Sequence, residues 1–374
     1  MCMKILMTVT QNSLLDGINR HILAVASELN KLCDVEVAVC TVFKRGELHL
    51  ALEKQGVKTF ALDAPHGHSF RIIQKFANVM REFRPDIIHI HGLAFCERLY
   101  LWFSRNKCKL VVTRHGIGSQ SVLDNLICCL FPLSILGEIY VSQGVMEYYL
   151  GASLNTKGAH VSIIYNPVNI DIEVGCKRKD FRAELGLPES AKIIGTACRI
   201  AAIKQPQCFI RVMAKVLLAN PHATAVILGD GPSEMVRLMN ETIKETGIGD
   251  RIRFLGYRAD AASLVAAFDV FVMTSRSEGM PTAVLEAMSH GVPIAFWNGN
   301  GGLKDLYEIN RIEQFGVSTS NGDIEGLALG ISTLLTDENQ HAKCAASARQ
   351  ICREKFSSQY IAKQLFKFYT SLAS

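Results

Sequence analysis

The fold of this chain is indicated most clearly by residues Lys192 to Pro232, KIIGTACRIAAIKQPQCFIRVMAKVLLANPHATAVILGDGP. It begins with a short apolar run, continues with helically spaced apolar residues, and ends in a second apolar run followed by Gly-Asp-Gly-Pro. Short apolar runs bounded by turn residues are typical of buried strands, and a longer segment with a 3.6-residue period is typical of a helix. Two strands joined by such a helix lie parallel in one sheet.

The same alternation of strands and helices runs through the whole chain. A first series begins at MKILMTVT, and the order starts again after Asn166, where a charged, irregular piece intervenes. We therefore predict an α/β protein with two doubly wound, Rossmann-like domains. The predicted parts are residues 1–168, residues 169–355, and a helix over 356–374 that has no following strand and packs back toward the N-terminal domain.

Composition places the chain among ordinary globular proteins. Of its 374 residues 49% are hydrophobic and 20% charged, without a long polar tract, so extensive disorder is excluded. The 12 cysteines form no CxxC pair, which predicts no zinc site. The N-terminus lacks the pattern of a signal peptide, which predicts a cytoplasmic protein with reduced thiols. The longest apolar run, Leu126–Leu136, is too short to cross a bilayer, and we favour a buried helix there over a membrane-facing or acceptor-facing segment.

The net charge of +5 lies mostly in the predicted N-terminal domain, where 17 Lys and Arg stand against 13 Asp and Glu. This excess is too weak to indicate nucleic-acid binding, but it is compatible with an anionic membrane surface. A basic amphipathic helix predicted over 70–84 carries Arg71, Lys75 and Arg81 on one stripe, with Arg84 behind them. Peripheral docking on the inner face of the cell membrane and a merely solvated helix face both remain open.

Residues with useful chemistry follow several predicted strands. In an open parallel sheet, ligands bind beyond the carboxyl ends of the strands. The residues found there are Gly17, His115, Arg199, Lys204, Gly231 and Glu278. We therefore expect the site at these strand ends.

The stretch SRSEGMPTAVLEAMSHGVPI, 275–294, places two carboxylates around one helix start. Pro281 suits the first turn and Gly291 suits the end, so Glu278 lies in the loop before the helix and Glu286 lies on it. The helix N-terminus between them offers free N–H groups to a phosphate. The alternative is that Glu278 caps the helix and Glu286 is a surface charge.

These segments resemble glycosyltransferase family 4, whose members have the GT-B architecture of two Rossmann-like domains facing across a cleft. SRSEGMPTAVLEAMSHGVPI matches the family's Glu-x7-Glu element, and CRIAAIKQ matches its Arg-x4-Lys element. VILGDGP, IRFLGY, RPDIIHIHG and VTRHG match further recurring segments in the same order. The resemblance covers nearly the whole chain.

The resemblance implies an acceptor-binding N-terminal domain and a C-terminal domain that binds a nucleotide-diphosphate sugar as substrate, with no cofactor. Glu286 would bind the ribose hydroxyls and Glu278 those of the transferred sugar, while Arg199 and Lys204 would neutralise the diphosphate. His115 would lie near the reacting sugar. The remaining donor-binding residues implied are Gly17, Gly231, Gly256, Tyr257, Gly279, Met280, Pro281 and Thr282. Of the other strand-end histidines, we expect His89 to be structural, and leave His91 open.

Some positions depart from the family pattern. Cys198 stands where a glycine usually precedes the arginine, and Asn166-Pro167 replaces the usual Asn-Gly of the interdomain turn. FWNGNGGLKDL is about one residue longer than the common loop and carries Asp305 where glutamate is frequent. These departures affect the geometry of sugar and acceptor, and leave the reaction class unchanged.

We therefore expect a metal-independent, retaining hexosyltransferase that moves a sugar from a nucleotide diphosphate, UDP above all, to a glycan hydroxyl. By analogy, the acceptor would be lipid-linked and the product a surface polysaccharide or lipopolysaccharide. The alternatives are a nucleotide-sugar epimerase of the same architecture and a non-catalytic glycan-binding subunit. No acidic pair or Cys/His cluster in the sequence offers an evident metal site.

Overall fold

The computed structural model describes residues 2–14, 16–65, 69–104, 108–117, 130–151, 158–170 and 175–373. The chain divides into two compact units, which are described separately. Unit 1 is Met1–Pro167 with Ser358–Ser374, and unit 2 is Val168–Ser357. The beginning of the apolar run 126–136, for which a buried helix was predicted, lies outside the described residues.

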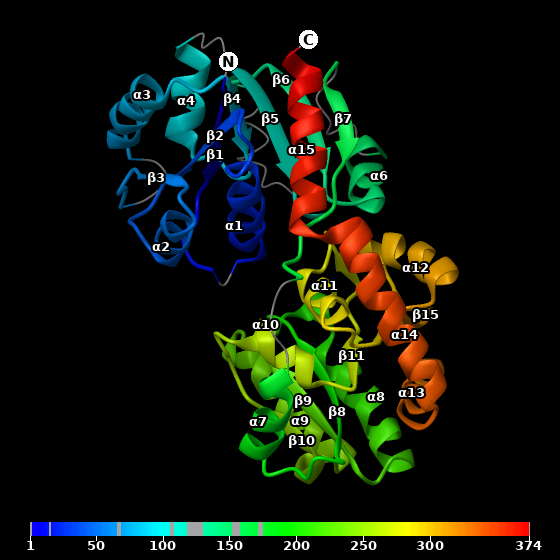
Figure 1. Cartoon of the computed structure of the whole chain (residues 1–374). Coiled ribbons are helices and arrows are strands. Elements are labelled where there is room, and N and C mark those ends of the chain that lie inside the picture. Colours follow the sequence, from blue (N-terminus) through cyan, green and yellow to red (C-terminus); the bar gives the residue numbers. More distant parts are fainter. Residues whose placement is uncertain are drawn as a thin grey trace. The chain divides into compact units, whose positions relative to one another are not determined.

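Unit 1 is built on a seven-stranded parallel sheet (Figure 1). In the order β3-β2-β1-β4-β5-β6-β7, the strands are Lys58–Ala61, Val35–Thr41, Met3–Val9, Ile87–Ile90, Lys109–Arg114, Ile135–Tyr140 and His160–Ile163. The helices are α1 (Gly17–Leu29), α2 (Glu47–Lys54), α3 (Arg71–Phe83), α4 (Phe95–Phe103), α6 (Gln143–Gly151) and α15 (Ser358–Ala373).

The central strand β1 explains why the sheet is covered on both faces. Its side chains alternate, so Ile5 and Met7 join one buried cluster while Leu6 joins another. The first cluster contains residues of α1 and α15, which pack beside one another (Figure 1). The second contains residues of α3. A strand that is buried on both faces reads as a continuous apolar run, which is what MKILMTV is.

The C-terminal helix α15 is part of the core of unit 1. Leu365, Phe368 and Leu372 are buried in the cluster that β1 and α1 share. Gly137 of β6 makes room for this helix, because a Cβ atom there would lie 2.8 Å from the ring of Phe368. Tyr369 donates or accepts a hydrogen bond of 2.6 Å with His89 of β4.

Unit 2 repeats this architecture with a six-stranded parallel sheet of order β10-β9-β8-β11-β13-β15. The strands in this order are Ile252–Phe254, Ala223–Leu228, Lys192–Ala197, Val270–Met273, Ile294–Asn298 and Gly316–Ser320. A small pair adds β12 (Ser277–Glu278) and β14 (Asn300–Gly301). The helices are α7 (Gly175–Glu184), α8 (Pro206–Ala219), α9 (Ser233–Thr246), α10 (Ala261–Leu264), α11 (Thr282–Ser289), α12 (Gly302–Glu313), α13 (Ile324–Thr336) and α14 (Glu338–Ile351).

Both sheets therefore have the doubly wound strand order, with the direction of winding reversed between β1 and β4 and between β8 and β11. The predicted fold class, two Rossmann-like α/β domains, is confirmed. Because ligands bind where the winding reverses, this order points to the loops that follow β8 and β11 in unit 2, and β1 and β4 in unit 1.

Candidate active site

In unit 2, an ion pair joins the loops that follow β8 and β11. The Lys204 ammonium lies 2.5 and 2.6 Å from the two carboxylate oxygens of Glu278. Both side chains are largely buried, with 19% and 10% of their surfaces exposed. The two loops are also joined through the backbone, since the Arg276 N–H donates to the Ile203 carbonyl over 2.8 Å. The structure thus brings together two residues that lie 74 positions apart.

Arg199, the second predicted cation, is in a different state. Its side chain is exposed, and no ion pair or hydrogen bond engages it within the described part of the chain. The family resemblance implies the same task for both cations, but the structure distinguishes them. Lys204 is already neutralised by Glu278, whereas Arg199 keeps its full charge for a ligand.

Two glycines hold the Arg199 loop against the turn after β9. A Cβ atom at Gly229 would lie 1.8 Å from the Cys198 carbonyl oxygen, and one at Gly231 would lie 2.0 Å from that of Ile200. Gly231 is thus needed for packing against the Arg199 loop, whatever it contributes to a ligand. Cys198, which replaces the family's glycine, points its thiol inward, and burial raises its pKa to about 11.

Helix α11 begins at Thr282, shortly after Glu278 in the sequence. Pro281 lies in the N-cap position with extended backbone, one residue earlier than the first-turn position expected, and Thr282 is the first helical residue. The helix ends at Ser289 and is followed by Gly291, whose φ of 71° only glycine adopts easily, and the Val292 N–H returns to the Ala287 carbonyl over 3.0 Å. Glu286 is half-buried on this helix, as predicted.

The loop of Glu278 is held from the other side by the long glycine-rich loop. Ser277 and Glu278 pair as β12 with Asn300 and Gly301 of β14. Gly302 approaches so closely that a Cβ atom there would lie 2.3 Å from the Gly279 carbonyl oxygen. Met280 is buried at 4% exposure, so its side chain packs inside the unit. Asp305, the departure from the family pattern, is buried in the first turn of α12.

Gly256 and Tyr257, two of the donor-binding residues implied by the resemblance, lie after β10. Gly256 has a φ of 64° and its carbonyl accepts a hydrogen bond of 2.8 Å from the Gly229 N–H. This bond ties the turn to the glycine turn after β9. Tyr257 follows with 51% of its surface exposed, which leaves its ring free to stack on a planar ligand.

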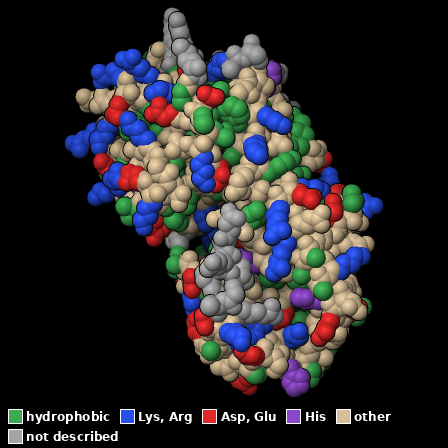
Figure 2. All heavy atoms as spheres, in the orientation of Figure 1, with side chains coloured by type: hydrophobic (Ala, Val, Ile, Leu, Met, Phe, Trp, Pro, Cys, Tyr) green, Lys and Arg blue, Asp and Glu red, His purple; other side chains and the backbone are tan. Residues whose placement is uncertain are grey.

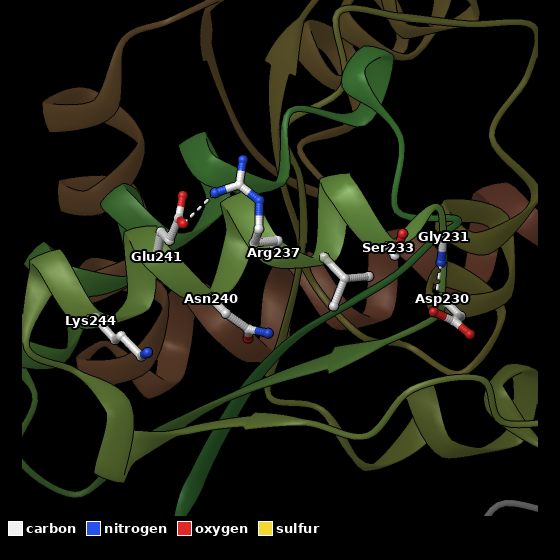
Figure 3. Close-up of a pocket in the computed structure, with 8 residues that line it drawn as sticks. Asp230, Gly231, Ser233, Arg237, Asn240, Glu241 and Lys244 are labelled. Carbon is white, nitrogen blue, oxygen red and sulfur yellow. Dashed lines mark hydrogen bonds and ion pairs between the residues drawn. The ribbon is translucent and has the colours of Figure 1, made fainter.

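An open groove of about 610 Å³ runs along α9 and starts at Asp230 and Gly231 (Figure 3). Its charges are largely satisfied internally, because Arg237 is paired with Glu241 at 2.5 Å and with Glu234 at 2.6 Å. We therefore place the candidate site at the Lys204–Glu278 pair, and Gly231 is the one predicted site residue that lines this groove.

In unit 1, the loop after β1 leads into α1 at Gly17. Asp16 caps the helix, and its carboxylate accepts a hydrogen bond of 2.9 Å from the Ile18 N–H. A carboxylate here occupies one of the N–H groups that a phosphate would use at a helix N-terminus. Gly17 lies at the start of the helix, as expected, but the Asp16 carboxylate already places a negative charge at the first turn.

Four histidines gather near the carboxyl ends of the neighbouring strands of unit 1. His89 lies within β4, where it is fully buried and hydrogen-bonded to Tyr369 and to the Thr113 hydroxyl, each over 2.6 Å. Its predicted structural role is confirmed. His91 Nδ1 lies 2.8 Å from His115 Nε2 in a hydrogen bond. His21, which the sequence analysis did not single out, reaches the same place from α1.

Burial keeps these imidazoles neutral. It lowers the pKa of His21 from 6.5 to about 4, with a smaller opposing effect of the hydrogen bond to Asn166. It lowers the pKa of His89 to about 3, where nearby His21 adds to the effect. The pKa values of His91 and His115 also lie well below 6.5, through burial first and neighbouring histidines second. These four histidines are therefore neutral hydrogen-bonding groups.

Helix α3 is amphipathic as predicted, with Ile72 and Phe76 buried and Arg71 and Arg81 exposed, but its basic groups are mixed with acidic ones. The Lys75 ammonium lies 3.6 Å from the Asp63 carboxylate, and Lys58 pairs with Glu82 at 2.7 Å. Figure 2 shows basic and acidic side chains side by side at the edge of unit 1 that carries α2 and α3. Within the residues the structure describes, no helix combines the length and apolarity that crossing a membrane requires.

Comparison with known proteins agrees with this architecture. Residues 177–351 match the model of "Glycosyl transferases group 1", and residues 15–172 match that of "Glycosyltransferase Family 4". The chain thus consists largely of two glycosyltransferase domains, one in each half.

Individual relatives are glycosyltransferases as well. The chain is 26% identical over 310 residues to N-acetyl-alpha-D-glucosaminyl L-malate synthase of Bacillus anthracis, covering 81% of this chain and 79% of that protein. It is 32% identical over 277 residues to UDP-Gal:alpha-D-GlcNAc-diphosphoundecaprenol alpha-1,3-galactosyltransferase of Escherichia coli, covering 68% and 64%. The crystal structure of Anabaena Alr3699/HepE in complex with UDP and glucose has the same fold, with a TM-score of 0.81, 22% identity, and 99% and 100% of the chains covered.

Proposed function

We propose that this protein transfers a sugar from a nucleotide diphosphate, UDP in the first instance, to a hydroxyl of a glycan acceptor. The observation that carries the proposal is the Lys204–Glu278 pair at the point where the sheet of unit 2 reverses its winding, with unpaired Arg199 in the same loop and the N-terminus of α11 beside it. UDP as donor nucleotide is further supported by the names of the galactosyltransferase relative and of the UDP complex.

The charge of each residue indicates which part of the donor it binds. The exposed Arg199 guanidinium and the first turn of α11 suit the diphosphate, because a leaving diphosphate gains negative charge in the transition state. Lys204 approaches the same phosphates and holds Glu278 in place, so the Glu278 carboxylate is oriented to accept hydrogen bonds from the transferred sugar. Glu286, about one turn into the helix, binds the ribose hydroxyls.

In the proposed reaction, the bond between the anomeric carbon and the diphosphate oxygen breaks as the acceptor oxygen bonds to the same carbon. The acceptor proton passes to the leaving diphosphate, which acts as the base on that face, and the anomeric configuration is retained. Charge neutralisation by Arg199, Lys204 and the helix makes the step independent of a metal ion. His115 and Gly17 are the contributions proposed for unit 1.

The acceptor class follows from the relatives only by analogy. One relative acts on a diphosphoundecaprenol-linked sugar according to its name, and others are named for O-antigen or lipopolysaccharide core biosynthesis. We propose a lipid-linked oligosaccharide of surface-polysaccharide assembly, reached from the cytoplasmic face of the membrane.

The donor is tested with a panel of UDP-, GDP- and ADP-sugars scored by thermal stabilisation. A sugar nucleotide at about 100 times its dissociation constant adds roughly 2.7 kcal/mol to the free energy of unfolding. The stabilising donor is then offered with lipid-linked and free glycan acceptors, and the anomeric configuration of the product is determined by NMR. If no sugar nucleotide stabilises the protein, the proposed donor class is wrong. A product with inverted anomeric configuration contradicts the proposed retention.

Metal independence has its own test. Transfer should proceed at an undiminished rate in excess EDTA, since the charges that replace the metal are covalently part of the chain. Loss of activity that Mg²⁺ or Mn²⁺ restores would contradict this part of the proposal while leaving the donor assignment intact.

A further inference from the structure

Three histidines of unit 1 converge from separate elements. His21 comes from α1, His91 follows β4, and His115 follows β5. Each offers one ring nitrogen such that the three atoms lie within 4.8 Å of one another. The ring centroids are 4.9 to 5.3 Å apart. We propose that these three side chains form a binding site for a d-block divalent cation, Zn²⁺ in the first instance.

The lone pairs that a cation needs are present. The Nε2 atoms of His21 and His91 are buried and have no hydrogen-bond partner among the residues that the structure describes. A buried polar atom without a partner is uncommon, because leaving it unsatisfied costs about 1–3 kcal/mol. Two such atoms in one cluster indicate that something else satisfies them.

The tautomer of His21 supports this assignment. Its Nδ1 lies 3.0 Å from Asn166 Oδ1, and an amide oxygen can only accept, so Nδ1 carries the proton and Nε2 carries the lone pair. A histidine that ligates a metal usually donates its other N–H to an oxygen in this way, which fixes the ring and leaves the free nitrogen aimed at the ion. Asn166 is thus the orienting residue of the site.

The spacing requires a modest adjustment. Ligand nitrogens of a tetrahedral zinc site, with bonds of 2.0–2.1 Å, lie about 3.3 Å apart. The three nitrogens lie within 4.8 Å of one another, so the widest pair must close. Rotation of the imidazole rings about their Cβ–Cγ bonds closes it and exchanges the 2.8 Å hydrogen bond between His91 Nδ1 and His115 Nε2 for coordination.

The ligand set selects the class of ion. It consists of imidazoles alone, which suit zinc, copper, nickel and iron, whereas magnesium, calcium and manganese prefer oxygen ligands. Three histidines also leave a fourth position for water or another ligand. The inference concerns binding and does not depend on the proposed transfer. One consequence does rest on it: an ion that engages His115 should slow transfer, so micromolar Zn²⁺ is expected to inhibit.

The test uses the full chain with Cys2 and Cys33, the exposed described cysteines, changed to serine, so that surface thiolates do not compete. Chelator-treated protein is titrated with Co²⁺ and followed by its visible absorption, and Zn²⁺ is then added in competition. We expect one equivalent of tetrahedral Co²⁺ without the intense charge-transfer band of a thiolate ligand, and its displacement by one equivalent of Zn²⁺.

Variants locate the site. His21→Gln, His91→Gln and His115→Gln should each weaken binding at least about tenfold, and Asn166→Ala should do so by about 10- to 100-fold. His160→Gln, an exposed histidine of the same unit, is the matched control and should bind like the parent. Circular dichroism verifies that each variant is folded. Absence of stoichiometric binding, or affinities that follow His160 as much as the three histidines, overturns the proposal.

A second measurement decides the matter even where a variant does not fold. Diethyl pyrocarbonate modifies accessible histidines of the parent protein, and mass spectrometry locates the adducts. Zn²⁺ should protect His115 and leave His160 unprotected. Equal modification of His115 with and without Zn²⁺ overturns the proposal. Inhibition of transfer by Zn²⁺ is scored separately, so that failure of the proposed function cannot be mistaken for failure of the site.

Discussion

The two units share a strand order but carry opposite chemistry where the winding reverses. In unit 2, the loops after β8 and β11 hold permanent charges, with Lys204 paired to Glu278 and Arg199 exposed. In unit 1, the corresponding region holds buried imidazoles that burial keeps neutral. The backbone therefore decides where a ligand binds, and the side chains on the loops decide which ligand it is.

The difference has a physical basis in solvent access. In unit 2, Arg199 is exposed and the largely buried Lys204 and Glu278 neutralise each other, so a diphosphate can bind at Arg199 without leaving an isolated buried charge. Of the clustered histidines of unit 1, His21 and His91 are buried and His115 is partly buried, so a charged form is disfavoured and only a neutral ligand or a coordinated cation fits. Changes to one unit should accordingly affect catalysis, and changes to the other should affect metal binding and pH dependence.

The largest effect is expected from removing the cations of unit 2. Arg199→Ala or Lys204→Ala should lower turnover at least about a hundredfold, the scale for losing one preorganised charge donor. Lys204→Ala also leaves Glu278 without its partner, so it should be the more severe of the two. Steady-state kinetics measure the loss, and Lys215→Ala, which removes the exposed pair with Glu325, is the matched control. Near-normal turnover in both variants would contradict the proposed binding of the diphosphate by Arg199 and Lys204.

Acid should destabilise unit 1 through its histidines. The folded state keeps His21 neutral down to about pH 4, while the unfolded chain takes up a proton near pH 6.5. The resulting stability is fully present above pH 6.5 and is lost as the pH falls from 6.5 to about 4, on the order of 3 kcal/mol for this residue.

Urea unfolding between pH 7 and pH 4.5 measures this loss, and hydrogen exchange assigns it to a unit. His21→Asn should unfold with a shallower pH dependence than the parent, and His160→Asn with an unchanged one. If the parent were equally stable at pH 7 and pH 4.5, the neutral-histidine interpretation would be wrong.

The two carboxylates of unit 2 should separate binding from transfer. Glu286→Gln should weaken UDP binding about tenfold, as expected for losing a hydrogen bond to a charged group. Glu278→Gln releases Lys204 from its partner, so UDP should bind within about threefold of the parent, ~0.6 kcal/mol, while transfer falls. Calorimetry with UDP and a transfer assay distinguish the two, and identical behaviour of both variants toward UDP would refute the division of roles.

The smallest effect concerns membrane docking of α3. Changing Arg71, Lys75 and Arg81 to glutamine should reduce salt-sensitive binding to anionic vesicles, at most by about 1 kcal/mol for each group. Lys75 should contribute least, because Asp63 already lies 3.6 Å from its ammonium. Co-sedimentation measures the binding, with Lys179, Lys215 and Lys244 of unit 2 changed to glutamine as the matched control. If vesicle binding changes neither with salt nor with the α3 substitutions, the basic face of α3 is not the docking surface.

The fold class was predictable from the sequence alone, and so was the position of the candidate site. Apolar runs such as KIIGTA and ATAVIL, with a helix between them, dictate parallel strands. Arg199 and Lys204 follow the first of these runs, and Glu278 follows the later strand β11. These are local properties, because strand and helix periods are visible within about ten to fifteen residues. His89 was also predictable, since a histidine inside a buried apolar strand must satisfy both of its nitrogens.

Which of these residues meet, and in what charge state, depends on the packing of the whole chain. Glu278 neutralises Lys204 and leaves Arg199 unpaired. This difference depends on how the two loops, which hold residues 74 positions apart, pack against each other. The histidine cluster escaped the sequence for the same reason, because His21, His91 and His115 follow no ligand spacing along the chain and converge only when α1, β4 and β5 pack in one unit. Burial sets the pKa of each imidazole, and burial is a property of the packed chain that no local pattern encodes.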